Sequence, residues 1–273
     1  MKTQLFKLST FALLLGLLVF ASSCVNDHRA PTPPCKLSAI DRGNANTHTY
    51  TYDAAGKITQ MQREFDGTGS GNISKYVYTF IYDAAGLLIK SSIKLDGKDY
   101  GTETYSYSNG KISKSTYVNA DGSQGINNLK YNTAGQITEF TFETGDPNYD
   151  GKQYFEYDAN GIMTKRGFAD LQGNKYFEVV IKPVGIAKSP EQLLANNGLP
   201  YDLLTGFSWQ AADGNVGTVY EVYYADQDGK LVFDSQEKIT DLKTNSQGYI
   251  IENTSTDAAN KSNTQRFTLT DCN

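Results

Sequence analysis

Residues 50–58 read YTYDAAGKI, and residues 80–88 repeat the pattern as FIYDAAGLL. In the first stretch, aromatic side chains two positions apart share one face of a strand. Asp53 suits the first position of a turn, and Gly56 suits the left-handed position that closes it. Ile58 then begins a return strand. Each stretch therefore predicts a β-hairpin.

Further copies of this hairpin follow along the chain. The motif tyrosine recurs about every 25 residues, a period typical of repeat architectures whose units cannot bury a face alone. The additional copies are YSYSNGKI (105–112), LKYNTAGQI (129–137), FEYDANGIM (155–163) and a weaker copy, LKTNSQGYI (242–250).

A second set of turns lies between the copies, as Asp-Gly pairs that favour tight reversals. Each repeat is then two strands and two turns. We therefore predict an all-β fold: an antiparallel meander of about 16 strands of about 6–9 residues, curled into a barrel or a strongly curved sheet, with an open sheet or sandwich as the alternative. The pairs are 66–67, 96–97, 121–122, 150–151, 213–214 and 228–229.

The strand faces support this prediction. In KYVYTFIY (75–82) the aromatic residues share one face, and in LLIKSSIKL (87–95) we expect Leu87, Ile89, Ile93 and Leu95 to oppose the lysines. With 19 Tyr and 13 Phe against one Trp, the packed face is expected to be largely aromatic.

One helix is predicted at about 189–197, covering an opening of the barrel. Ser189 can cap it, Pro190 suits its first turn, and Asn197-Gly198 can end it. The sole tryptophan, Trp209, follows this helix. It is either a buried anchor for the helix or a candidate ligand contact.

The N-terminus has the features of an export signal. Lysines precede the apolar run FALLLGLLVF (11–20), and ASSC ends at Cys24. This stretch resembles the lipobox of bacterial lipoproteins, which implies cleavage after residue 23 and lipid on Cys24. The alternative is an ordinary signal peptide with an unrelated cysteine. We expect residues 24–35 to be the lipidated Cys and a flexible tether, and residues 36–273 to be a single β-repeat domain.

Cys35 and Cys272 stand at the two ends of that domain. In an exported protein an even pair is a disulfide candidate, and the alternative is two free thiols. These cysteines and the two histidines, His28 and His48, are too few ligands for a metal site, so no metal or cofactor is predicted.

The hairpin motif Y-x-Y-D-x-x-G-x-(I/L) resembles the YD repeats of Rhs-type proteins. The whole chain resembles Bacteroidota lipoproteins of unknown function with a porin-like fold. This resemblance implies a lipid anchor in the outer membrane, facing either the periplasm or the cell surface, and implies no activity. We do not expect a transmembrane pore, because Lys90, Lys94, Lys114 and Glu139 lie opposite the aromatic faces.

No catalytic residue is predicted, since no G-x-S-x-G elbow, H-E-x-x-H or P-loop occurs. Loops 119–125 and 226–230 offer closely spaced oxygens, as calcium loops do, although Asp-Gly turns explain both. Loop 144–153 is either a long hairpin loop or a ligand contact. The net charge of −5 argues against a nucleic-acid partner.

We therefore expect a non-catalytic scaffold or binding module of the cell envelope, held to the membrane by lipid. Its partner would be a glycan or an envelope protein. The alternatives are capture of a surface glycan or small ligand, and a hydrolase built from Asp and Glu residues.

Overall fold

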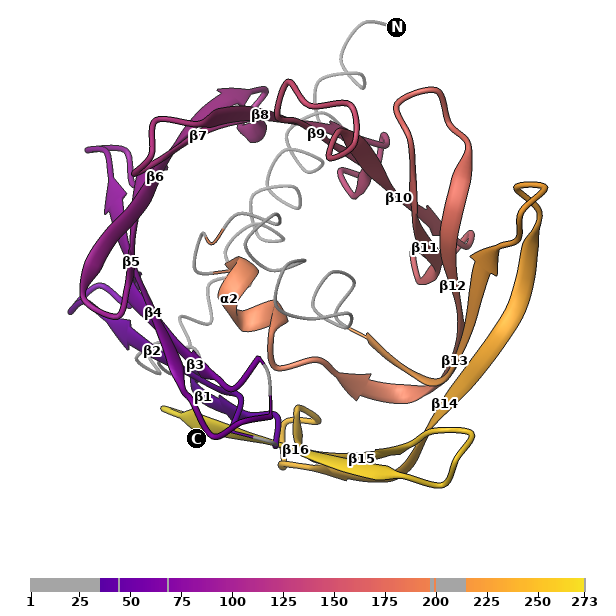
Figure 1. The fold of residues 1–273 in the computed structure, drawn as a ribbon. Helices are drawn as coiled ribbons and strands as arrows, with labels where there is room; N and C mark the ends of the chain where they lie inside the picture. Colours follow the sequence, from indigo (N-terminus) through magenta and orange to yellow (C-terminus); the bar gives the residue numbers. More distant parts are fainter. Residues whose placement is uncertain (1–34, 44, 68, 197–198, 200–214, 273) are drawn as a thin grey trace, which may run out of the picture. The chain divides into compact units, whose positions relative to one another are not determined.

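The chain folds into a closed ring of antiparallel strands in a computed structural model (Figure 1). The structure describes residues 35–43, 45–67, 69–196, 199 and 215–272. Cys24 and Trp209, and the Asp-Gly pair at 213–214, lie outside the described residues.

The described part of the chain contains sixteen strands and one helix. They are β1 (Lys36–Asp41), β2 (Thr47–Tyr52), β3 (Ile58–Phe65), β4 (Ser74–Tyr82), β5 (Leu88–Leu95), β6 (Lys98–Ser108), β7 (Lys111–Asn119), β8 (Gln124–Tyr131), β9 (Ile137–Glu143), β10 (Gly151–Tyr157), β11 (Met163–Ala169), β12 (Lys175–Lys188), α2 (Gln192–Asn196), β13 (Asn215–Ala225), β14 (Leu231–Thr244), β15 (Ile250–Thr256) and β16 (Ser262–Thr270).

Every strand pairs with its neighbours in sequence, and β1 pairs with β16 to close the barrel. Closure leaves no sheet edge exposed to another chain. The predicted all-β meander is confirmed, and among the shapes left open it is the closed barrel. Strands β12 and β14 reach 14 residues, longer than the sequence suggested.

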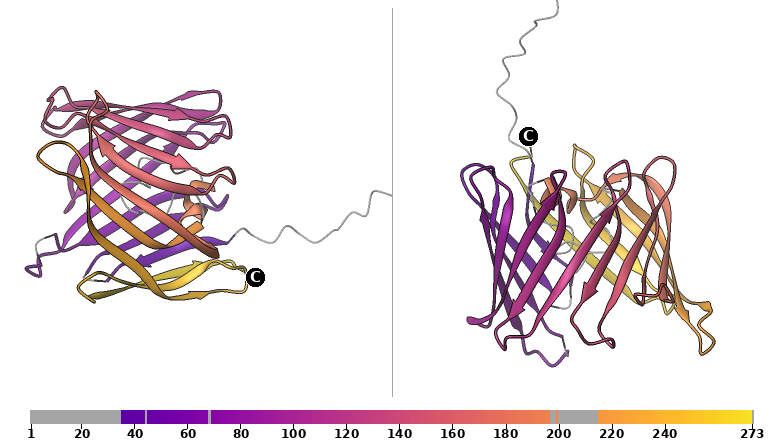
Figure 2. Two further views of the ribbon diagram at one scale, coloured as in Figure 1. Left: turned by 90° about the vertical axis from the view of Figure 1, so that its right-hand side faces the viewer. Right: turned by 90° about the horizontal axis from the view of Figure 1, so that it is seen from above.

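The turns of the repeated hairpins all lie at one end of the barrel, together with Cys35 and Cys272, because every second connection of a meander returns to the same end (Figure 2). We call this the repeat-turn end. The Asp-Gly pairs at 66–67, 96–97, 121–122, 150–151 and 228–229 lie at the opposite end.

The repeat turn has the geometry that its sequence predicts. The backbone N–H of Lys57 donates to Oδ1 of Asp53 at 2.9 Å, and the N–H of Gly56 donates to the Asp53 carbonyl at 3.0 Å. Gly56 has φ +83°, a region that a side chain disfavours. Asp83 and Asp158 accept the equivalent bonds in their own turns.

A β-bulge accompanies each repeat turn and corrects one prediction. The register shifts between Ile81 and Tyr82, and equivalent shifts precede the other motif tyrosines. Because the extra residue reverses the alternation, Leu88 is buried whereas Leu87 and Ile89 are exposed. Leu87 and Ile89 therefore do not share the packed face with Ile93, as the simple period of two had predicted.

Two Asp-Gly pairs do not form the predicted tight turns. Asp66-Gly67 lies in the longer connection between β3, which ends at Phe65, and β4, which begins at Ser74. Gly151 is the first residue of β10, and the reversal before it is the longer loop 144–150. Asp150 closes that loop, since its Oδ1 accepts the N–H of Thr144 at 2.6 Å.

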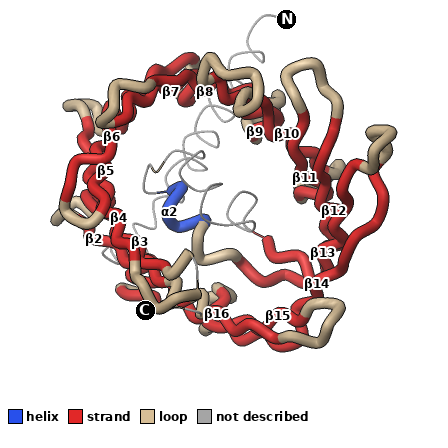
Figure 3. Tube along the Cα trace, viewed as in Figure 1, coloured by secondary structure: helices blue, strands red, loops and turns tan. Residues whose placement is uncertain are grey.

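The packed face of the strands is the inner face of the barrel. Helix α2 lies inside the ring and contacts β1 (Figures 1 and 3). Leu193 and Leu194 belong to the same buried cluster as Leu37 and Ile40 of β1. The predicted helix is thus confirmed, in a shorter form. The hydroxyl of Ser189 is buried without a hydrogen-bond partner among the described residues, so it does not act as the expected side-chain cap.

Candidate functional site

The two cysteines of the domain form a disulfide. Cys35 and Cys272 bond across a sequence separation of 237 residues, with their Cα atoms 4.5 Å apart. The bond is possible because β1 and β16 are neighbours in the closed ring. It joins the two ends of the folded domain at the repeat-turn end.

The two calcium-like loops use their oxygens within their own turns. Oδ1 of Asp121 accepts the N–H and the hydroxyl of Ser123, at 2.9 and 2.6 Å. Oδ1 of Asp226 accepts the backbone N–H groups of Asp228 and Lys230. Within the described ranges no group of three or more His, Cys, Asp or Glu side chains is placed to hold a metal ion.

The outer wall of the barrel is polar and ion-paired. Glu252 on β15 accepts from Lys243 Nζ at 2.6 Å and from Arg266 Nε at 3.0 Å, across three adjacent strands. The hydrogen bond from Lys243 lowers the pKa of the Glu252 carboxyl. Glu139 on β9 pairs with Lys130 and Lys152 in the same way, at 2.7 and 3.7 Å.

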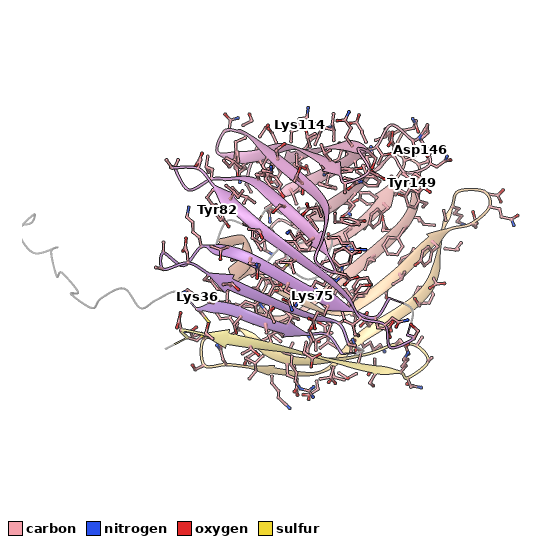
Figure 4. All side chains as sticks on the ribbon, turned by 60° about the vertical axis from the view of Figure 1, so that its left-hand side comes forward. Lys36, Lys75, Tyr82, Lys114, Asp146 and Tyr149 are labelled. Carbon is pink, nitrogen blue, oxygen red and sulfur yellow. A yellow bond between two sulfur atoms is a disulfide. The ribbon has the colours of Figure 1, made fainter. Side chains whose placement is uncertain are left out.

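Other outward positions include hydroxyl groups, lysines and some exposed apolar side chains, among them Ile81, Ile89 and Val118. Thr254 and Thr264 pair across β15 and β16, with their hydroxyl oxygens 2.9 Å apart. Lys75 and Lys114 are exposed on β4 and β7 (Figure 4). No helix in the described part of the chain has the length and apolar character needed to cross a membrane.

A buried charged group lies where α2 meets the inner wall. Arg42 donates to Oε1 of Glu191 at 2.6 Å, and both side chains are largely buried. His48 on β2 is also buried, and this burial, with the positive charges of Arg42 and Arg63, lowers its pKa to about 2. His48 is therefore neutral in the folded protein.

A second buried group on the inner wall is a hydrogen-bond network over β5–β8. Tyr105 donates its hydroxyl proton to Oε2 of Glu103 at 2.8 Å, and its oxygen lies 3.1 Å from that of Ser91. Asn127 donates to Oε1 of Glu103 and to Ser115, at 3.3 and 3.0 Å. Satisfied in this way, these polar groups can face the barrel interior at little cost.

Aromatic side chains line the inner wall toward the opposite end. On β3, β4 and β6 they are Phe65, Tyr76, Tyr78 and Tyr100, with ring centroids 5.7–6.5 Å apart along the series. Tyr100 is 43% exposed. We call these four residues and Arg63 the Tyr76 platform.

A second aromatic group lies on β11, β12 and β13, the strands across the ring from β3, β4 and β6 (Figure 1). Phe168 stacks with Tyr176 at 6.3 Å between centroids, and Phe177 contacts Tyr224 at 5.1 Å. Tyr176 and Tyr224 are 45% and 49% exposed. The inner wall at this end therefore presents partly exposed rings on two opposed surfaces, an arrangement suited to an amphipathic ligand.

Sequence reasoning identified the aromatic face of β4 but missed the platform. Arg63 and Phe65 follow Met61 at alternate positions of MQREF, a signal that was available. Tyr100 could not be assigned, because a bulge in the β5–β6 register hides which face it occupies. Tyr149, in the polar loop 144–153, is 69% exposed (Figure 4).

Comparison with known proteins establishes the fold alone. No family model and no curated protein matches the sequence. Among solved structures, a porin-like protein from Bacteroides uniformis has a TM-score of 0.55 at 14% identity, over 88% of this chain and 99% of that chain. Two TcdB2-TccC3 structures match at TM-scores of 0.21 and 0.20 and 13% identity, over 80% and 78% of this chain and 15% and 14% of theirs. The chain thus has a porin-like β-barrel fold.

Proposed function

We propose that this protein is a lipid-anchored, non-catalytic binding module of the cell envelope whose barrel stands in water. The observation that carries the proposal is the contrast between its two walls. Ion pairs centred on Glu252 and Glu139 lie on the outer wall, and partly exposed aromatic rings lie on the inner wall. A barrel that spans a bilayer needs the reverse, an apolar outer band, since each Lys or Arg at the midplane costs about 2–4 kcal/mol.

Strand β1 begins at Lys36, at the repeat-turn end, so a lipid on Cys24 would hold that end toward the membrane. The opposite end, with the Tyr76 platform, would then face away from it. The YD-like hairpins would serve as the frame of this barrel, with no encapsulating role of the Rhs kind.

Two alternative functions, ligand capture and hydrolysis, assign different roles to the side chains of the inner wall. Capture of a glycan or small ligand is favoured by the partly exposed rings of Tyr100 and Tyr224. A hydrolase needs two carboxylates close together. The strand register puts Glu103 and Glu237 on the inner face, but β6 and β14 lie on opposite sides of the ring, so this pair gives the hydrolase no support.

Palmitate labelling of the whole chain in a bacterial host tests the anchor. We expect label on the wild type and on Cys35→Ser, and none on Cys24→Ser. The unlabelled Cys24→Ser protein should partition into the aqueous phase without detergent. A folded barrel that still requires detergent would contradict the proposal and indicate a spanning pore.

Protease shaving of intact cells then decides the side of the membrane. Loss of the protein without lysis would place it on the cell surface. Protection until lysis would place it in the periplasm and direct the search to envelope partners.

A further inference from the structure

We propose that one part of the barrel rim is a docking surface for a basic, amphipathic segment of another polypeptide. This inference rests on the proposed binding function and names the class of partner. The surface lies at the end opposite the repeat turns, where β12 begins, β13 ends and β14 begins, side by side in the ring (Figure 1). We call it the β12–β14 rim and define it by Leu171, Tyr176, Tyr224, Val232 and Phe233.

Exposed apolar side chains are concentrated on this rim. The exposed fraction is 57% for Phe233, 49% for Tyr224, 45% for Tyr176, 42% for Val232 and 39% for Leu171. These residues come from three consecutive strands and from the connection that precedes β12. An apolar surface gathered in this way is typical of an interaction site, whereas single exposed apolar residues need no explanation.

The strand register shows that the rim exposes apolar groups on both faces of one hairpin. Tyr224 pairs with Val232, and Tyr223 pairs with Phe233. Tyr224 also pairs with the buried Phe177, which puts the first pair on the inner face. Because successive residues of a strand point to opposite faces, the second pair lies on the outer face, where its two rings meet edge to face with 5.8 Å between centroids. A partner that lies across the rim can contact both faces.

The rim also carries net negative charge. Asp228 and Asp234 lie on either side of Val232 and Phe233 in the chain, and both are exposed. The two connections at the rim add further carboxylates and one cation. The charged residues of these connections are Asp170, Asp226, Asp228 and Lys230.

This combination favours a basic segment over other partners. Lys and Arg side chains pair with carboxylates, and their cationic groups also stack on the faces of aromatic rings. The apolar side chains of the same segment would cover Val232 and Phe233. A nucleic acid, an anionic membrane surface or the rim of a second copy would bring like charge to Asp228 and Asp234, which is unfavourable.

Fluorescence anisotropy with two labelled peptides, on the whole protein, tests the proposal. One peptide contains lysine and leucine, and the other has glutamate in place of every lysine. We expect the lysine peptide to bind the wild type with an affinity that falls as salt is added, and the glutamate peptide not to bind. Phe233→Ser should weaken the binding about tenfold, the order of magnitude of one interface anchor. Asp228→Asn should weaken it about threefold, as expected for an exposed charge.

Ile89→Ser and Asp241→Asn are the matched controls, because both residues are exposed but lie toward the repeat-turn end, on β5 and β14. Their binding should equal that of the wild type. Thermal unfolding of each variant separates a lost contact from a lost fold. Absence of binding to the lysine peptide, or equal losses in Phe233→Ser and Ile89→Ser, would overturn the docking surface.

Sedimentation velocity tests the other occupant, a second copy of the chain. We expect the wild type to be a monomer. A dimer that Phe233→Ser converts to a monomer would overturn the proposal in favour of self-association. A Cys24→Ser protein that remained soluble without detergent would still uphold the water-exposed barrel.

Discussion

The hydroxyl of Tyr82 donates a hydrogen bond of 2.7 Å to the carbonyl oxygen of Ile58, the first residue of β3 in the preceding hairpin. The motif tyrosine of one repeat therefore closes onto the return strand of the repeat before it. Lys57 strengthens the same junction, because its Nζ donates to the Gly86 carbonyl at 2.7 Å and lies 5.0 Å from the centroid of the Tyr82 ring.

This junction is repeated around the barrel. Each bond joins a motif tyrosine to the first or second residue of the return strand before it, or to Leu37 in the first case. The repeats are therefore linked through tertiary contacts as well as strand pairing. The further bonds are Tyr52–Leu37 at 2.7 Å, Tyr107–Leu88 at 2.9 Å, Tyr131–Ile112 at 2.8 Å and Tyr157–Ile137 at 2.9 Å.

Removing one of these hydroxyls should destabilise the barrel. Tyr82→Phe keeps the ring but leaves the Ile58 carbonyl without its donor, so the free energy of unfolding should fall by about 1–2 kcal/mol. Thermal unfolding followed by circular dichroism should show a lower midpoint. Tyr149→Phe, at a 69% exposed site, should leave the midpoint unchanged. Equal unfolding midpoints for the two variants would show that the hydrogen bond from Tyr82 to Ile58 contributes nothing to the stability of the barrel.

Two glycine substitutions can separate the effect of the contact between Lys57 and Gly86 from the backbone strain of alanine at positive φ. Gly86 and Gly229 both have positive φ, at +81° and +77°, so alanine at either position should cost about 1–2 kcal/mol in backbone strain. A Cβ at Gly86 would also meet Nζ of Lys57, whereas one at Gly229 would meet nothing within 4 Å. Gly86→Ala should therefore unfold at the lower denaturant concentration of the two. A larger loss in Gly229→Ala would contradict this role for Lys57.

The disulfide should stabilise the domain mainly by restricting the unfolded chain. For a loop as long as that between Cys35 and Cys272, the chain-entropy model gives about 5 kcal/mol as an upper figure. The Cys35→Ser/Cys272→Ser double variant should unfold at markedly lower denaturant than the oxidised protein. Added reductant should destabilise the wild type and leave the double variant unaffected. A wild type insensitive to a reductant that breaks the bond would exclude this contribution.

Burial of neutral His48 predicts a specific pH dependence. Its pKa is lowered from 6.5 to about 2 in the folded state, so below pH 6.5 the unfolded chain binds a proton that the folded chain does not. The stability contributed by neutral His48 is therefore present above pH 6.5 and is lost as the pH falls, by about 1.4 kcal/mol per pH unit.

His48→Gln should remove this part of the slope between pH 6.5 and 4.5, although its stability at neutral pH is expected to be lower than that of the wild type. Denaturant unfolding at a series of pH values measures the slope. His28→Gln, a change in the predicted tether, should retain the wild-type slope. Parallel pH profiles for the wild type and His48→Gln would refute the assignment.

The hairpins and the disulfide partners could be predicted because their signals are local or follow from the order of the chain. Asp53 and Gly56 specify one turn through their own backbone preferences, and repetition of that turn makes a meander. Export and an even cysteine pair in the domain were sufficient to suggest the bond between Cys35 and Cys272.

By itself, then, the sequence determined the repeat unit, its antiparallel order and the aromatic character of the packed face, since turn chemistry and the period of two act within a few residues. Closure of the sheet, the inward direction of the aromatic face and the meeting of Phe65, Tyr76 and Tyr100 could be seen in the folded barrel alone. Closure depends on twist and register summed over all the strands, and a single bulge reverses which residues face the interior.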